Sequence, residues 1–215
     1  MHKVVLILAC GLLLTACQTT GLFGAAEEEP DWQSHRNAYD ALRTKYYDKG
    51  SYARALASAK TIFELADQDY EVATAENGVV AHRTWTTFPG EDPGEAWWYV
   101  AVGTAEDGRI VVRARMTPDP DPNAPQDLSS GRVDRLEPGI INPTETGTFE
   151  LTDADGAVGL FLMRMDWLMR ANPYWLYCNA AAEYAKIEHW QGSLDAFCRQ
   201  ADDVRADRVP LNLPK

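Results

Sequence analysis

The sequence predicts an α+β protein, in which an antiparallel meander sheet is flanked by an N-terminal helical hairpin and a C-terminal helix pair. Apolar residues recur at three- and four-residue spacing before residue 70 and after residue 172, which is typical of amphipathic helices. Between them, β-branched and aromatic runs surround Asn77-Gly78 and Asp107-Gly108, dipeptides that favour tight turns between antiparallel strands. The hydrophobic content of 46% is high enough for a packed core.

Residues 1–16 have the pattern of an export signal. Lys3 precedes an apolar run that is shorter than the roughly 20 residues of a membrane span. The run ends at Leu14-Thr15-Ala16-Cys17, which resembles the lipobox of bacterial lipoproteins. In that family the signal is cut before the cysteine, which then carries the lipid. An ordinary secretory signal followed by a chance cysteine is the alternative.

The lipoprotein resemblance implies a location in the cell envelope. Cys17 would carry the lipid, and residues 17–31, which are mostly polar and small, would form a flexible tether. Multiple acyl chains hold a protein stably on a bilayer. Gln18 follows the cysteine where an aspartate favours the inner membrane in that family, so the resemblance implies an outer-membrane anchor that faces the periplasm.

Residues 32–69 are expected to form the helical hairpin, with a break at residues 48–51. The pattern resembles one tetratricopeptide repeat, and an ordinary amphipathic helix pair is the alternative. The positions at that spacing are Tyr39, Leu42, Tyr46, Gly50, Tyr52 and Ala55. On either interpretation, Tyr46 and Tyr52 are candidate partner-binding residues.

Residues 70–171 are expected to form the β region, with two hairpins at the turns named above. The Pro-rich stretch 117–147 is too long for an ordinary connection, and such loops tend to be functional or disordered, so it is the predicted mobile or binding segment. Apolar residues at alternate positions from Phe161 to Met169 favour a strand over 157–171. The Leu and Met content of this segment would also suit a helix.

Residues 172–215 are expected to form the C-terminal helices and tail. Asn172-Pro173 has the pattern of a helix start, and Ser193 that of the cap of a second helix. Removal of residues 1–16 takes away Cys10, and Cys17 would carry the lipid, so Cys178 and Cys198 are the remaining pair. Export favours a disulfide between them. Helices that turn at Gly192 would leave the two cysteines too far apart, so the bridge requires an earlier turn or an angled crossing.

Charge and motifs exclude several functions. A net charge of −12 is unsuited to nucleic acid and to an anionic lipid surface. The sequence contains no HExxH, GxSxG, SxxK, GxxxxGK or GxGxxG pattern, and its mature histidines are far apart in the chain. We therefore expect no catalytic residues, no metal site and no cofactor, and the activity is more consistent with binding than with catalysis.

Aromatic residues of the predicted sheet are the remaining candidates for binding. Trp85, Trp97 and Trp98 could contact a ligand or a partner, although packing of a sheet against helices uses the same residues. The first hypothesis is a non-catalytic envelope protein that binds a protein partner or assists assembly. The second is a module that binds a glycan or an apolar small molecule, and the third is an enzyme that acts on the cell wall.

Overall fold

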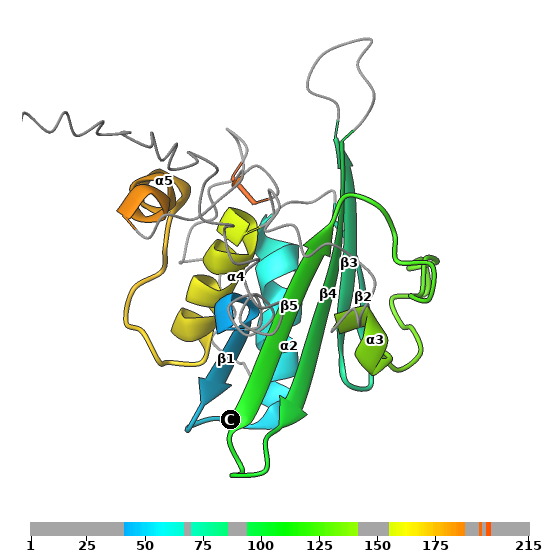
Figure 1. Ribbon diagram of the computed structural model, residues 1–215, viewed down its shortest axis with the longest axis horizontal. Coiled ribbons are helices and arrows are strands. Elements are labelled where there is room, and N and C mark those ends of the chain that lie inside the picture. The colour runs from blue at the N-terminus through cyan, green and yellow to red at the C-terminus, as the bar shows by residue number, and fades with distance from the viewer. Residues whose placement is uncertain are drawn as a thin grey trace, which may run out of the picture.

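The computed structural model describes residues 41–66, 70–85, 94–141 and 155–187, together with Leu194, Phe197 and Cys198. Over these ranges the chain is an α+β protein with one antiparallel sheet, with α2 and α4 on one side and α3 on the other (Figure 1). The sheet order is β1-β5-β4-β3-β2, with bounds β1 Thr44–Tyr47, β2 Glu71–Ala75, β3 Gly78–Trp85, β4 Gly94–Thr104 and β5 Ile110–Thr117. The helices are α2 Tyr52–Ala66, α3 Pro138–Ile141, α4 Asp155–Leu168 and α5 Cys178–Ile187. The predicted fold class is confirmed.

Both predicted hairpins are present. Asn77 lies in the turn between β2 and β3, and its side chain exchanges two hydrogen bonds of 2.8 Å with the backbone of Leu136. The next residue is Gly78, where a Cβ atom would collide with the Val100 carbonyl oxygen. Gly108, in the turn between β4 and β5, has a φ of 84°, which glycine adopts without steric cost. These two turns require the residues from which they were predicted.

The predicted helical hairpin is wrong at residues 44–47, and its residues 32–40 lie outside the described residues. Residues 41–43 are helical, but residues 44–47 form the edge strand β1, which pairs with β5 along its whole length. Tyr47 enters the core, whereas Tyr46 points to the opposite face, as the two-residue period of a strand requires. Threonine and tyrosine favour strands, and pairing with β5 buries Tyr47. The resemblance to a tetratricopeptide repeat therefore ends at this strand.

The second half of that segment is the expected helix. Gly50 has a φ of 119°, and a Cβ atom there would lie 2.8 Å from Cε of Met169. Ser51 follows as the N-cap of α2, since its Oγ accepts a hydrogen bond from the Arg54 backbone N–H at 3.2 Å. Gly50 and Ser51 thus determine where the chain turns and where helix α2 begins.

The strand predicted over 157–171 is wrong, because Asp155–Leu168 forms helix α4. The alternate apolar pattern arises because nearly the whole circumference of this helix is apolar, as expected of a helix that is enclosed by protein. Its buried residues are Ala157, Val158, Leu160, Phe161, Leu162, Arg164, Met165 and Leu168. The partly exposed stripe of α4, Gly159, Met163, Asp166 and Trp167, is itself mostly apolar, so the sequence lacks the polar residues at three-to-four spacing that would have identified the helix.

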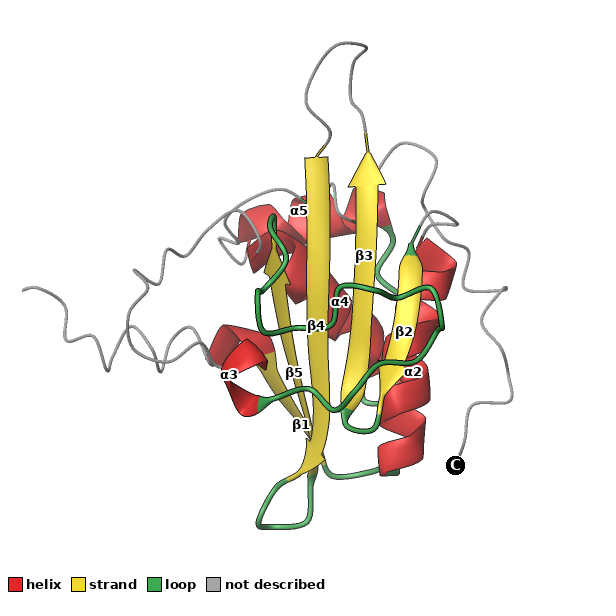
Figure 2. Ribbon diagram, turned by 90° about the vertical axis from the view of Figure 1, so that its right-hand side faces the viewer, coloured by secondary structure: helices red, strands yellow, loops and turns green. Residues whose placement is uncertain are grey.

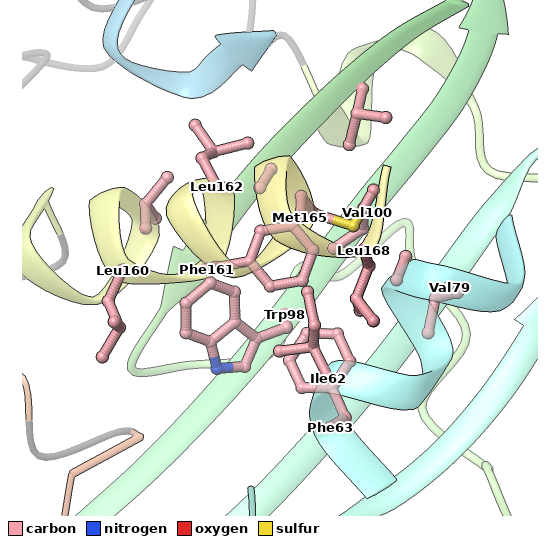
Figure 3. Packing of buried hydrophobic residues seen from close by; sticks show 14 of the residues in the cluster. Ile62, Phe63, Val79, Trp98, Val100, Leu160, Phe161, Leu162, Met165 and Leu168 are labelled. Carbon is pink, nitrogen blue, oxygen red and sulfur yellow. The ribbon is translucent and has the colours of Figure 1, made fainter. Parts of the chain in front are cut away.

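The main core lies between α2, α4 and the sheet. Phe63 of α2, Phe161 of α4 and Trp98 of β4 are fully buried and form one aromatic cluster, with ring centroids 5.4–5.8 Å apart (Figure 3). The Trp98 indole N–H donates a hydrogen bond of 3.2 Å to the Tyr70 hydroxyl. Trp98 is therefore a core residue.

The described part of the Pro-rich stretch, residues 117–141, crosses in front of β4, β3 and β2 on the face away from α2 and α4 (Figure 2). Four of its side chains are buried there against the sheet, at Ala124, Leu128, Leu136 and Ile140. Its backbone also bonds to Thr74 at the β2 edge, at 3.0 and 3.2 Å. This part of the predicted binding segment is thus a packed cover, and the rest, residues 142–147, lies outside the described residues.

The predicted disulfide is confirmed: Cys178 and Cys198 are bridged, with Cα atoms 5.4 Å apart. Helix α5 begins at Cys178 and not at Asn172-Pro173, so that part of the prediction is wrong. Instead, Asn172 Oδ1 accepts a hydrogen bond of 3.0 Å from the Tyr174 N–H in a tight turn. Helix α5 spans Cys178–Ile187, and residues 188–193, where the predicted turn falls, lie outside the described residues. Ser193 and most of the second C-terminal helix lie outside the described residues.

Candidate functional site

The predicted sheet tryptophans do not form a binding site. Trp98 is fully buried among α2, α4 and the sheet, as the packing alternative expected. Trp97 is 6% exposed on the other face, where it stacks on His82 at 4.0 Å between ring centroids and donates a hydrogen bond to Glu95. The side chain of Trp85 lies outside the described residues. The indole rings of Trp97 and Trp98 therefore both pack against other residues of the chain.

The two predicted tyrosines have different roles. Tyr52, at the start of α2, donates its hydroxyl hydrogen to the Glu76 carbonyl and partly packs against the core. Tyr46, on edge strand β1, is 46% exposed. Tyr46 is therefore the predicted binding residue that the structure leaves accessible to a partner.

Tyr46 lines two hollows, which together we name the Tyr46 groove. The first, the sheet hollow, has a volume of about 560 Å³ and lies over the end of the sheet formed by β1, β5 and β4. Its lining is Tyr46, Ala101, Val102, Gly103, Thr104, Ala105, Glu106, Val111 and Arg113. The second, the end hollow, has a volume of about 320 Å³ and is lined by Tyr46, Tyr47, Asp48, Lys49, Met169, Arg170 and Ala171.

Strand register positions the sheet hollow. Tyr46, Val111 and Gly103 form one row across β1, β5 and β4, and Arg113 and Ala101 pair in the next row on the same face. Glycine and alanine on β4 leave the floor low between the taller side chains of β5 and β1. A Cβ atom on Gly103 would lie 3.3 Å from a methyl carbon of Val111. The hollow therefore depends on the small residues of β4.

Arg113 is the notable charged residue of the sheet hollow. Its Nε is buried and has no hydrogen-bond partner, and its guanidinium forms no ion pair within the described residues. Arg115, two residues further along the same face of β5, has two acceptors: Nη1 lies 2.8 Å from Asp121 Oδ2 and 2.7 Å from the Ile140 carbonyl. The described residues thus supply acceptors for Arg115 but none for Nε of Arg113.

A second arginine braces the rim of the groove. The Arg109 guanidinium lies over the Tyr46 ring, 4.6 Å from its centroid, and forms a 2.7 Å ion pair with Asp107. The hydrogen bonds from Arg109 lower the pKa of the Asp107 carboxyl below its ordinary value. Arg109 thus covers one side of the Tyr46 ring, and the rest of the ring lines the two hollows.

The floor beneath β1 is tied to α4 through Asp166. Its two carboxylate oxygens accept a hydrogen bond of 3.0 Å from the Tyr47 hydroxyl and one of 3.2 Å from Lys45. Burial, and then the negative charge of Asp166, raise the pKa of Tyr47 far above its ordinary value. These contacts fix β1 against the helix layer, so that Tyr46 stands on a rigid strand.

The lining of the Tyr46 groove combines aromatic, basic and small apolar side chains with two carboxylates, Asp48 and Glu106. Among the residues that the structure describes, no three histidine, cysteine or carboxylate side chains cluster as metal ligands do. An aromatic ring, an arginine and a low apolar floor are features of protein-binding surfaces.

Comparison with protein-family models, with curated proteins and with solved structures gives no match for this chain. In the ranges that the structure describes, none of the helices has the length and apolar character needed to cross a membrane.

Sequence reasoning identified Tyr46 but missed Arg113. Tyr46 was selected as a helix residue, and it functions as an exposed residue of a strand. Arg113 lies in the run RIVVRARM, whose arginines among apolar residues could belong to any half-exposed strand. No described residue offers an acceptor to its Nε, and this property of the folded chain has no signal in the sequence.

Proposed function

We propose that this chain is a non-catalytic, lipid-anchored protein of the bacterial cell envelope that binds a protein partner through the Tyr46 groove. The observation that carries the proposal is the combination, in one hollow, of the exposed Tyr46 ring and of Arg113, whose buried Nε has no acceptor among the described residues. Tyrosine and arginine are enriched among the residues that dominate binding energy at protein interfaces.

The layout of the sheet supports a docking surface at this place. On the face away from α2 and α4, the 117–141 segment packs on β2, β3 and part of β4. The sheet hollow of the groove occupies the other end of the same face, next to edge strand β1. A partner there would continue the layer that the chain itself begins.

The resemblance to a lipobox supports the proposed location at an envelope membrane. With Cys17 lipidated, Tyr46 would follow the anchor by 29 residues, counted from position 17 to position 46. The strong negative charge of the chain would keep the folded part off an anionic bilayer surface. A tethered binding surface close to the membrane suits a protein that recruits or assembles an envelope partner.

Site-specific photocrosslinking in intact cells tests the proposal. Benzoylphenylalanine in place of Tyr46 should yield a protein adduct on irradiation, and the same probe in place of the exposed Tyr174, which lies outside the groove, is the matched control. The Tyr46 adduct should disappear in an Arg113→Gln background. Intact mass should show a diacylglycerol-sized addition on Cys17. The absence of a protein adduct, or the same adducts at both positions, would contradict partner binding at the groove.

A further inference from the structure

We infer that the segment bound in the Tyr46 groove is an extended acidic peptide, which places one carboxylate on Arg113 and an apolar side chain two residues away over Gly103 and Val111. This inference rests on the proposed function and specifies the chemistry of the partner.

Arg113 requires an acceptor that the described chain does not supply. Its Nε is buried and has no hydrogen-bond partner among the described residues, and a buried donor that is left unsatisfied destabilises a protein, more so when it is charged. Arg115 shows how the same strand face satisfies an arginine when the role is structural, with Asp121 and the Ile140 carbonyl as acceptors. A carboxylate from outside would give Arg113 the charge-assisted contact that Arg115 already has.

The lining favours a single carboxylate over a polyanion. The sheet hollow contains one cation, Arg113, and one anion, Glu106, so its net charge is about zero in a chain of −12. Glu106, at the hairpin end of the sheet hollow, would repel a second negative charge beyond the first. The site therefore fits one acidic side chain, and neither nucleic acid nor an anionic lipid surface.

The floor sets the spacing within the peptide. Arg113 and Val111 are two residues apart on one face of β5, which is about 7 Å in a strand. In an extended peptide, residues i and i+2 also point to the same side at about 7 Å. An acidic residue over Arg113 therefore brings its neighbour two positions away over Val111 and Gly103, beside the Tyr46 ring. The expected pattern is an Asp or Glu, any residue, then an apolar residue, in either direction.

A displayed library of random nonapeptides, selected on the purified full-length chain, tests the inference. Selected peptides should contain the acidic and apolar pair at that spacing. Arg113→Gln should weaken their binding by about tenfold or more, since a hydrogen bond to a charged group contributes about 1.5–3 kcal/mol. Arg135→Gln, which removes an exposed arginine outside the groove, is the matched control and should change binding less than about twofold.

A second measurement removes dependence on the folding of the variant. Replacing the acidic residue of a selected peptide by Gln or Asn should weaken binding to the unmodified chain by about the same factor as Arg113→Gln. Equal binding of the two peptides would overturn the inference, as would selected peptides without an acidic residue or the selection of no peptide at all.

Other occupants are outcomes of the same test. Binding of decanoate that depends on Arg113, with no peptide binding, would overturn the inference in favour of a small amphiphile. Self-association that is lost in Arg113→Gln would overturn it in favour of a second copy of this chain. If crosslinking at Tyr46 succeeds but the peptides lack the acidic residue, the proposed function stands and only its acidic partner fails.

Discussion

Arg170 occupies a backbone conformation that normally belongs to glycine. It follows α4 with a φ of 61°, and it is the only non-glycine residue with a positive φ in the described ranges. Its N–H bonds to the Trp167 carbonyl and that of Ala171 to the Asp166 carbonyl, which is the Schellman ending of a helix. The left-handed conformation costs an L-residue roughly 1–2 kcal/mol. Arg170 is therefore retained against a steric penalty.

Arg170→Gly should increase the free energy of unfolding by about 1 kcal/mol relative to Arg170→Ala. Burial, and then the positive charge of Arg170, lower the pKa of Arg54. Both variants remove this charge, but only glycine removes the backbone penalty. Urea unfolding of the two variants measures the difference. Equal stability of the glycine and alanine variants would show that the conformation carries no penalty here.

Tyr47 links stability to alkaline pH. Its pKa is raised in the folded state above the ordinary 10.0, so the unfolded chain ionises first as the pH rises. The stabilisation is complete below about pH 10 and is lost above it, by up to about 1.4 kcal/mol per pH unit. Tyr47→Phe cannot ionise, so its free energy of unfolding should fall less between about pH 9 and pH 11 than that of the unmodified chain. Parallel declines in the two proteins would refute the assignment.

At the scale of elements, the C-terminal region depends on its disulfide. The Cys178–Cys198 bridge closes a loop with a sequence separation of 20 residues and holds the buried Phe197 against Phe63 and Trp98, whose centroids lie 5.7 and 4.6 Å away. Cross-linking at such a separation stabilises a protein by about 3 kcal/mol. Reduction should lower the free energy of unfolding by about that amount. A variant with both cysteines replaced by serine should show no response to the reductant.

Local chemistry explains which elements could be predicted. The two hairpins and the start of α2 depend on residues within a few positions of each turn, such as Gly108 and Ser51, so the sequence was sufficient. Strand β1 and helix α4 depend on partners far along the chain, namely β5 for the strand and the surrounding core for the helix. Their local patterns supported the wrong element because tertiary contacts decided it.

The candidate site divides in the same way. A large aromatic such as Tyr46 attracts notice in any sequence, and its accessibility then follows from the outward face of β1. Arg113 and Arg115 cannot be distinguished by residue type or strand position. Asp121 and Ile140, which engage only Arg115, reach it from the loop and from α3. The acceptors, and hence the site, come from the packing of distant segments.

For the whole molecule, the main core and the sheet hollow lie on opposite faces of the sheet. Phe63→Ala removes a ring that is enclosed by Phe161, Trp98 and Tyr70, and it should lower the free energy of unfolding by about 3–5 kcal/mol. Tyr46→Ala removes a ring that is 46% exposed, and it should change stability by less than about 1 kcal/mol while it weakens binding of the peptides selected on the unmodified chain. Thermal and urea unfolding of the two variants measure the contrast. Similar destabilisation by both would argue that Tyr46 is part of the fold.

The pairing of β1 with β5 also determines the order in which the chain can be completed. Thr44 faces Arg113 across this ladder, whereas β2 to β5 are joined in sequence by short connections. During synthesis at about 5–20 residues per second, the 69 residues between Thr44 and Arg113 take roughly 3–14 s to appear. For that interval β1 has no neighbour and Tyr47 no core to enter. The surface that carries Tyr46 is thus among the earliest parts of the described chain to be made, and it is completed only when a strand from the middle of the sequence arrives.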